Sequence, residues 1–240
     1  MGDGGFGAKI MFTISEEIPI IGGVPITETI TTTWIIMAIL IIGSIILTRN
    51  LKRIPGGVQN IVETVVGTVY NLTESTMGKD KVSFAPYIGT LMMYLAVANL
   101  VGLLGIRPPT ADLNMTLSLA LMTFFMIHFN GIRRKGILGY LKGFTEPFFL
   151  LTPINIIGEI ATPISLSFRL FGNMVGGTII MALVYSALAA LTTALFGMNI
   201  PIFQLGIPAV LHVYFDVFSG LLQTFIFAML TMVFVSGAMD

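Results

Sequence analysis

Residues 151–177 read LTPINIIGEIATPISLSFRLFGNMVGG, and this stretch decides how the rest of the chain is interpreted. Arg169 is the only Lys or Arg between Lys142 and Asp240, and its neighbours are apolar or small. An arginine at the centre of a membrane helix is costly, by about 2.5–3.5 kcal/mol on insertion scales, so it is rarely kept without a use. Its guanidinium stays charged, so it can hold a fixed positive potential but cannot release a proton. The stretch therefore predicts a membrane helix built around one functional charge.

The polar residues of this stretch fall on one face of the predicted helix. Asn155, Thr162, Arg169 and Gly176 recur every seven residues, and Asn173 lies four residues after Arg169. Residues at these spacings share a helix face. Small residues let a second helix approach closely, and polar ones supply hydrogen bonds away from lipid. The pattern predicts a face that is dedicated to a partner.

The composition is that of a membrane protein. The chain has 240 residues, is 55% hydrophobic and 10% charged, and has a mean hydropathy of +0.93. These values predict an all-α polytopic membrane protein forming a single integral membrane domain over residues 1–240. The chain has no cysteine, which excludes disulfides and thiolate metal sites. We expect no cofactor, no bound metal and no nucleic-acid partner.

About five segments are apolar enough to cross a membrane, and one further segment is amphipathic. In order, we expect an external N-terminal segment 1–30, a span 31–48, an amphipathic surface helix 56–78, a hairpin of spans 84–105 and 113–130, and a second hairpin of spans 147–197 and 201–237. The amphipathic pattern fits a helix on the membrane surface. It fits equally well a helix packed on a soluble partner.

The last two spans are too long for an upright crossing. The first of them measures roughly 70 Å if helical throughout, whereas the hydrocarbon core is about 30 Å thick. These helices must therefore be strongly tilted or broken, and Pro163 is a place where the first could bend. The short run FGMNIP predicts a tight connection and hence an antiparallel hairpin.

Basic residues indicate the orientation of the chain. Nine of the 12 Lys and Arg residues fall in segments 49–83 and 130–146. Because short cytoplasmic loops carry an excess of Lys and Arg, these two segments are predicted to be cytoplasmic. The N-terminus is then outside, and five crossings place the C-terminus in the cytoplasm.

The final span carries a polar stripe of its own. His212, Asp216 and Gln223 follow one another at spacings of four and seven residues, which places them on one helix face. Such a stripe serves either helix packing or a water path.

Three runs resemble a known family. PINIIGEIATPISLSFRLFGNMVGG, RPPTADLNMTLSLAL and LLQTFIFAMLTMVFVS are similar to subunit a of the F-type ATP synthases, and the likeness extends from about Thr29 onward. It implies a non-catalytic stator subunit of a bacterial plasma membrane. Its partners would be a rotating c-subunit ring, the peripheral-stalk b subunits and the other ATP synthase subunits. H⁺ or Na⁺ flow through two half-channels would be coupled to ATP synthesis or hydrolysis.

The resemblance also assigns roles to residues. The essential arginine of the family matches Arg169, and two of its polar residues match Asn173 and Gln223. Many members carry an acid nine residues after the arginine, where this chain has Thr178, so the acidic role passes to Asp216. Glu159 resembles an acid of chloroplast-type members. The residues expected along the ion path are Asp216, Gln223, Asn173, His212, Glu159, Asn99, Asp112 and Thr178.

A mechanism follows from the charge on Arg169. A c-subunit carboxylate must be neutral while it rotates through lipid, but an opposite charge nearby favours its ionised form. The ion therefore leaves near Arg169, and the same charge blocks direct passage between the half-channels.

Plainer roles and other classes of protein remain as alternatives. Arg169 could be paired with carbonyl groups, Asp216 could be a hydrogen-bonded buried acid, and His212 a packing residue. Glu159 could lie near the cytoplasmic surface, and Asp112 could pair with Arg107. A secondary transporter whose central arginine binds an anionic substrate is the main rival, although the internal repeats typical of such folds are not evident. A non-conducting scaffold for a peripheral stalk is a second rival.

Overall fold

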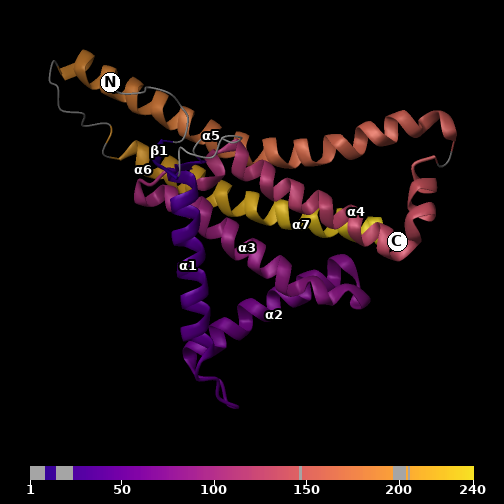
Figure 1. The fold of residues 1–240 in the computed structure, drawn as a ribbon. Coiled ribbons are helices and arrows are strands. Elements are labelled where there is room, and N and C mark those ends of the chain that lie inside the picture. Colours follow the sequence, from indigo (N-terminus) through magenta and orange to yellow (C-terminus); the bar gives the residue numbers. More distant parts are fainter. Residues whose placement is uncertain (1–8, 15–23, 146–147, 197–203, 205) are drawn as a thin grey trace.

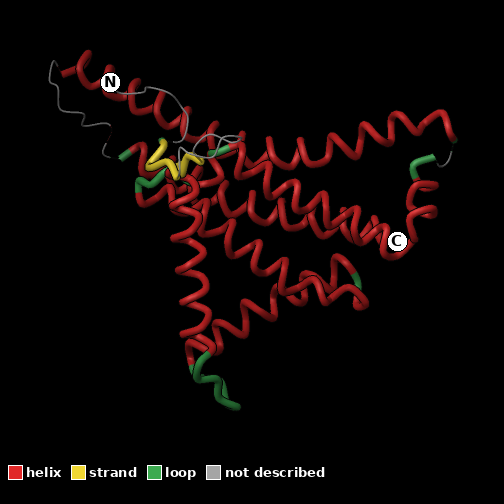
Figure 2. Tube along the Cα trace, viewed as in Figure 1, coloured by secondary structure: helices red, strands yellow, loops and turns green. Residues whose placement is uncertain are grey.

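The protein is a bundle of long helices (Figures 1 and 2), and its computed structural model describes residues 9–14, 24–145, 148–196, 204 and 206–240. Among these residues, five helices are long and apolar enough to cross a membrane. The prediction of an all-α polytopic membrane protein is therefore confirmed. One small sheet, which the sequence did not predict, stands at the N-terminal side.

That sheet consists of strands β1 (Ile10–Ile14) and β2 (Val24–Thr27), which pair antiparallel. β2 leads directly into α1 (Glu28–Thr48), and the Glu28 amide donates to the Lys9 carbonyl at 2.8 Å. The first span thus begins at residue 28, three residues before the predicted start at 31.

The amphipathic helix predicted at 56–78 is α2 (Gly57–Met77), which lies at a wide angle to α1 (Figure 1). Thr73 and Met77 near its C-terminal end are buried, while apolar residues of the remaining turns stay exposed. α2 ends at Gly78, whose φ of 95° favours glycine. A 3₁₀ turn, Lys79–Phe84, joins it to the second span.

The second span is α3 (Ala85–Leu100), extended by a 3₁₀ turn at Val101–Leu104. After a further 3₁₀ turn at Pro109–Ala111, α4 runs over Leu113–Gly143. α4 continues well past residue 130, where the third span was expected to end, although residues 131–143 include four glycines. It changes direction at Gly136, whose φ of 73° is left-handed.

The last two spans form a long antiparallel pair. The first is α5 (Thr152–Phe196), preceded by a 3₁₀ turn at Phe149–Leu151. The second combines α6 (Ile207–His212), a π-helical segment (Val213–Ser219) and α7 (Gly220–Met239).

α5 passes Pro163 without a break and is about 68 Å long at 1.5 Å per residue. It runs beside α4 and α7 at a steep angle to α1 (Figure 1). The first of the two long spans is therefore one continuous helix, whereas the second is divided by the π-helical segment. The tilt of these helices in a membrane stays a prediction. Residues 197–201 of the predicted connection FGMNIP lie outside the described part of the chain.

The core fixes how α5 is rotated. Leu166 and Leu170 of α5 pack with Leu95 of α3, Ala120 of α4 and Phe227 of α7. Hydroxyl pairs join the same helices: Thr116 with Ser167 at 3.1 Å and Thr123 with Thr231 at 3.3 Å. Such hydroxyl contacts hold membrane helices together where apolar burial gives little drive. Because positions 166, 167 and 170 point inward, Arg169 is directed to the outer flank of α5.

Candidate functional site

Arg169 stands on the exposed flank of α5. Within the described part of the chain, no hydrogen bond or ion pair engages its guanidinium. The carbonyl-paired arginine considered above is therefore not what the described residues form. A cavity of about 190 Å³ adjoins Arg169 and is lined by small residues of α5 and by Phe234 of α7. An accessible fixed charge thus faces a groove of low side-chain bulk.

Gln223 lies at the level of Arg169 along the helix pair. Ser219 donates to the Asn173 side-chain oxygen at 2.8 Å, which sets the antiparallel register. Arg169 lies four residues before Asn173 on α5, and Gln223 lies four residues after Ser219 on α7. Because the two helices are antiparallel, Arg169 and Gln223 fall at one level. The Gln223 side chain is 6% exposed, and its Nε2 has no hydrogen-bond partner among the described residues. A buried unpaired amide at this level is unusual, because buried polar groups are nearly always paired.

A cavity of about 420 Å³ lies between the turn after α3, the second half of α5 and the segment that carries His212 and Asp216. We name it the hairpin-end cavity, because it lies at the end of the bundle where strands β1 and β2 form a β-hairpin. Four residues predicted for the ion path line it together: Asn173, Thr178, His212 and Asp216. Arg107 also lines it. The tertiary structure therefore brings Asp216 to the same cavity as Thr178, which occupies the position of the missing acid.

His212 and Asp216 are in direct contact. The His212 Nδ1 and Asp216 Oδ2 atoms are 2.6 Å apart, and their side chains are 37% and 20% exposed. The other ring nitrogen, Nε2, lies 3.3 Å from the hydroxyl of Tyr185 on α5. The sequence analysis missed Tyr185 because no local pattern links it to a histidine 27 residues further on. The Gln204 side chain donates to the Tyr185 carbonyl at 2.7 Å.

The π-helical segment Val213–Ser219 explains why the predicted stripe divides. A π-helix has more residues per turn than an α-helix, so the seven-residue spacing no longer keeps one face. Asp216, inside the segment, faces the hairpin-end cavity, whereas Gln223, after it, is buried and does not line that cavity. π-helical turns occur frequently at functional sites.

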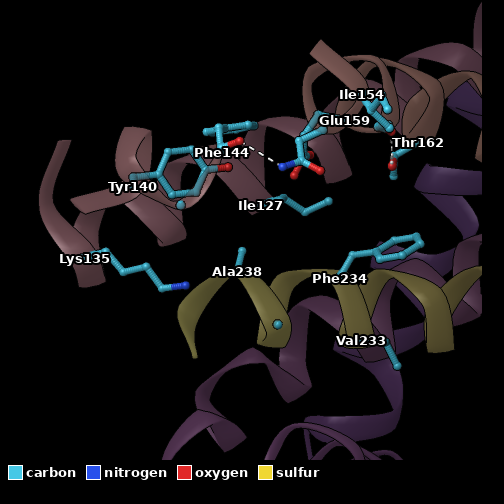
Figure 3. Close-up of a pocket in the computed structure, with 14 residues that line it drawn as sticks. Ile127, Lys135, Tyr140, Phe144, Ile154, Glu159, Thr162, Val233, Phe234 and Ala238 are labelled. Carbon is cyan, nitrogen blue, oxygen red and sulfur yellow. Dashed lines mark hydrogen bonds between the residues drawn. The ribbon is translucent and has the colours of Figure 1, made fainter. Parts of the chain in front are cut away.

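A second cavity, of about 860 Å³, lies toward the other end of the bundle, between α4, α5 and α7 (Figure 3). We name it the basic-end cavity, because Lys135 lines it. Glu159 and Asn155 line it from α5, and the Asn155 amide donates to the Phe144 carbonyl at 2.8 Å. Thr162 and Phe234 line both this cavity and the small one at Arg169. Arg169 therefore borders the inner limit of the basic-end cavity.

Two residues predicted for the ion path, Asn99 and Asp112, line neither of the two larger cavities. Asn99 is fully buried and donates to the Gly220 carbonyl at 2.9 Å and to Thr224 at 3.1 Å, while its oxygen accepts from Thr110 at 2.7 Å. Asp112 caps α4 by accepting from the Asn114 amide at 3.0 Å, and it accepts from Thr29 at 2.9 Å. The Asn99 contacts connect α3 to α7, and the Asp112 contacts connect α4 to α1. A role of either residue in ion passage stays a prediction.

Among the described residues, no group of three or more His, Cys, Asp and Glu side chains could hold a metal ion. The charged side chains that line the two larger cavities are Asp216 and Arg107 in one and Glu159 and Lys135 in the other, and Arg169 lines the small cavity.

Comparison with known proteins gives a consistent family. Residues 30–236 match the family described as ATP synthase A chain. The chain is 38% identical over 232 residues to the sodium ion specific ATP synthase subunit a of Propionigenium modestum, covering 90% of this chain and 75% of that protein. It is 38% identical over 219 residues to ATP synthase subunit a 2 of a Bradyrhizobium strain, covering 91% of each. It is 37% identical over 218 residues to ATP synthase subunit a of Geobacter sulfurreducens, covering 89% and 88%.

Proposed function

This chain belongs to the ATP synthase A chain family, and from that membership we propose that it forms the stationary ion path of a rotary ATP synthase. It is a multi-pass membrane protein and an ion-translocating subunit of the membrane sector. The membership argues against a secondary transporter that binds an anionic substrate. The ATP chemistry belongs to other subunits of the complex, and this subunit is non-catalytic.

Arg169 is the residue that separates the two halves of the path, and its position is the observation that carries the proposal. The guanidinium is exposed on a face whose neighbours are Gly158, Ala161 and Ser165. A rotating helix can pass close to such small side chains. A carboxylate carried by that helix would lose its ion opposite Arg169, because the fixed positive charge favours the ionised form. The partner proposed for this face is the c-subunit ring.

The two larger cavities are the proposed half-channels. The hairpin-end cavity holds Asp216, Asn173 and Thr178, and the basic-end cavity holds Glu159. On α5, the two sets of lining residues lie on either side of Arg169 along the chain. An ion that enters one cavity would therefore reach the level of Arg169 without a direct route into the other. The ion must then cross by riding on the ring.

Orientation and partners complete the proposal. The end with strands β1 and β2 would face outward, and the basic end with the C-terminus would face the cytoplasm of a bacterial cell. The exposed apolar residues of α2, such as Val58, Ile61 and Val65, would rest on the membrane surface or against the peripheral-stalk b subunits. The ion is H⁺ or Na⁺.

The test is Arg169→Ala in the complete ATP synthase complex reconstituted in vesicles. ATP-driven ion pumping should be lost, because the ring carboxylate keeps its ion and no charge separates the half-channels. Passive ion leak through the membrane sector should persist or increase. Pumping is followed by a pH-sensitive dye and by uptake of radioactive sodium.

Arg133→Ala is the matched control, because Arg133 is exposed on α4 and lines neither half-channel. It should leave pumping unchanged. Assembly of both variants is checked by copurification with the c-subunit ring. Normal pumping by an assembled Arg169→Ala complex would refute the proposal.

A further inference from the structure

We propose that residues 132–145 bind an anionic phospholipid in preference to a zwitterionic one. We name this segment the basic arm: it is the end of α4 with the two residues that follow it, and it holds four Lys and Arg residues and no Asp or Glu. The inference does not depend on the proposed ion path. It requires only that the arm lies at a membrane surface, and α4 is one of the five helices that are long and apolar enough to cross a membrane.

The inner side of the basic arm is packed against the bundle. The arm turns at Gly136, and the Tyr140 ring then lies over Gly131, where an added Cβ atom would be 2.5 Å from the ring. The centroid of the Tyr140 ring is 5.8 Å from that of His128 and 5.3 Å from that of Phe144. Tyr140 and Phe144 also line the basic-end cavity (Figure 3). These contacts fix which side of the arm faces away from the bundle.

The outer side of the arm is apolar. Ile137 and Leu138 precede Leu141 by four and three residues, so the three side chains form one stripe along the helix. They are 65%, 85% and 57% exposed, and the side chains of residues 148–150, which follow the arm, are exposed as well. Because a contiguous apolar surface of this kind marks a protein or membrane contact, the stripe requires an apolar partner.

Two basic side chains border this stripe. Lys142 lies four residues after Leu138, which places it at the edge of the stripe. Arg133 precedes Ile137 by four residues, which span at most about 14 Å. Both basic side chains are exposed, and neither has an ion-pair or hydrogen-bond partner among the described residues. Their charges are therefore available to a ligand that covers the stripe.

The other two basic residues of the arm are engaged elsewhere. Arg134 pairs with Asp80 of the turn before α3 at 3.0 Å. Lys135 extends into the basic-end cavity (Figure 3). Glu146, the next acidic residue in the sequence, lies outside the described part of the chain. Within the described residues of the arm, recognition on the outer side thus rests on Arg133 and Lys142.

An apolar stripe with cations at its edge matches the chemistry of an anionic phospholipid. The stripe lies at the boundary between acyl chains and headgroups, a layer that water still reaches, while the long Lys and Arg side chains extend to the phosphates. A zwitterionic headgroup carries its own compensating amine, whereas an anionic headgroup leaves the phosphate charge for the arm. Each Lys or Arg near an anionic membrane surface favours binding roughly fivefold. A free phosphate ion would use the two charges but would leave the stripe uncovered.

The experiment measures which lipid lies against the stripe, in the full chain reconstituted in lipid nanodiscs. Trp34→Phe removes the single tryptophan of the chain, and Leu141→Trp places a fluorescent reporter on the stripe. Brominated phosphatidylglycerol is titrated against phosphatidylcholine, and brominated phosphatidylcholine against phosphatidylglycerol. Quenching of the fluorescence gives the relative affinity of the two lipids at position 141. Phosphatidylglycerol should be preferred on the order of 10-fold, because two cations act together. Raising NaCl from about 0.1 M to about 1 M should reduce the preference, because the Debye length shortens from about 10 Å to about 3 Å.

Charge variants made in this reporter chain test the role of the two cations. Arg133→Gln and Lys142→Gln should each lower the preference roughly fivefold, and the double variant should bring the two affinities close together. Arg53→Gln is the matched control, because it removes one exposed cation from the loop between α1 and α2, outside the arm. It should leave the preference unchanged. The native Trp34, exposed on α1, is the control for position and should show little preference for either lipid.

Several outcomes would overturn the inference. Equal affinities of the two lipids at position 141, or a preference that survives the double variant, would show that the arm does not select an anionic lipid. A reporter that neither brominated lipid quenches would show that a second copy or another protein covers the stripe. Loss of the preference on adding inorganic phosphate at constant ionic strength would assign the charges to a free anion. Ile137→Trp repeats the measurement on the same stripe if the Leu141→Trp chain does not fold.

Discussion

The Asn99 side chain donates to the backbone carbonyl of Gly220 at 2.9 Å, at the point where α7 begins. The helices approach so closely there that a Cβ atom on residue 220 would lie 3.1 Å from the Cβ of Asn99. Gly220 directly follows the π-helical segment that carries Asp216. Asn99 therefore links α3 to the last span directly after the segment that carries Asp216.

Asn99→Ala should destabilise the protein by about 1–3 kcal/mol, the cost of leaving buried polar partners unsatisfied. Thr110 loses its acceptor, and Gly220 and Thr224 lose a donor. The thermal unfolding midpoint in detergent measures the effect. Asn130→Ala is the control, because among the described residues the Asn130 amide donates only to the Met126 carbonyl of its own helix. Equal midpoints for the two variants would contradict a special role for Asn99.

Gly136→Ala should destabilise the protein by roughly 1–2 kcal/mol, because a left-handed backbone is strained for a residue with a Cβ atom. Gly136 has φ of 73° and turns the end of α4 so that the Tyr140 ring reaches Gly131. Gly139→Ala lies on the same arm, and its added Cβ would meet Lys135 only at an ordinary 3.6 Å. It should be neutral or slightly stabilising in the same unfolding measurement. An unaffected Gly136→Ala variant would show that the turn at Gly136 is not needed.

Lys81→Met should destabilise the C-terminal end of α7 by about 1.5–3 kcal/mol, the range for hydrogen bonds of charged groups. Lys81 is 5% exposed, donates to the Ser236 hydroxyl at 2.9 Å, and pairs with Asp240. The decrease of the thermal unfolding midpoint relative to the wild type, at neutral pH, measures the effect.

The same pair predicts a pH dependence. The hydrogen bond from Lys81 holds the pKa of Asp240 below its ordinary value of 3.8. A lowered pKa in the folded state means that the pair stabilises the protein above pH 3.8 and loses this contribution as the pH falls through the folded value. The midpoint difference between wild type and Lys81→Met should therefore shrink in acid. Asp240→Asn removes the titrating group, so its midpoint should not show this acid-dependent loss.

Asp216→Asn should slow ion transport on the order of 10²-fold, the effect of removing a positioned acid. The amide keeps the size and hydrogen bonding of the side chain but cannot release an ion. Asp216→Asn combined with Thr178→Glu should regain part of the flux, because residues 178 and 216 line one cavity. Transport is measured in vesicles, with copurification of the ring as the check on assembly. A fully active, assembled Asp216→Asn complex would show that Asp216 is a packing residue.

Labelling of single cysteines should report the orientation of the chain, which has no native cysteine. Leu104 and Leu138 suit this test because they are 75% and 85% exposed at the two ends of the bundle. A cysteine at 104 should react with a membrane-impermeant reagent from outside intact cells. One at 138 should react only in inverted vesicles. The opposite result would reverse the proposed orientation.

The sequence alone determined the elements that depend on local pattern. Runs of apolar residues longer than a bilayer predicted five membrane helices, since hydrophobic length is a local property. The seven-residue recurrence around Arg169 predicted its small polar face, and the single charge marked the site. The four-residue spacing of His212 and Asp216 predicted a shared face, which their contact confirms. The length of α5 predicted a strong tilt.

Only the tertiary structure decided which distant residues meet. Tyr185 contacts His212 because two antiparallel helices bring positions 27 residues apart to one level, and no local spacing records this. Asp216 lines the hairpin-end cavity and Gln223 does not, and the π-helical segment between them changes the phase of the helical pattern. In the sequence, Asn99 does not differ from other polar residues of a membrane span. Its burial against Gly220 results from the close crossing of α3 and α7. Periodicity thus predicts the face of each helix, whereas packing decides what that face touches.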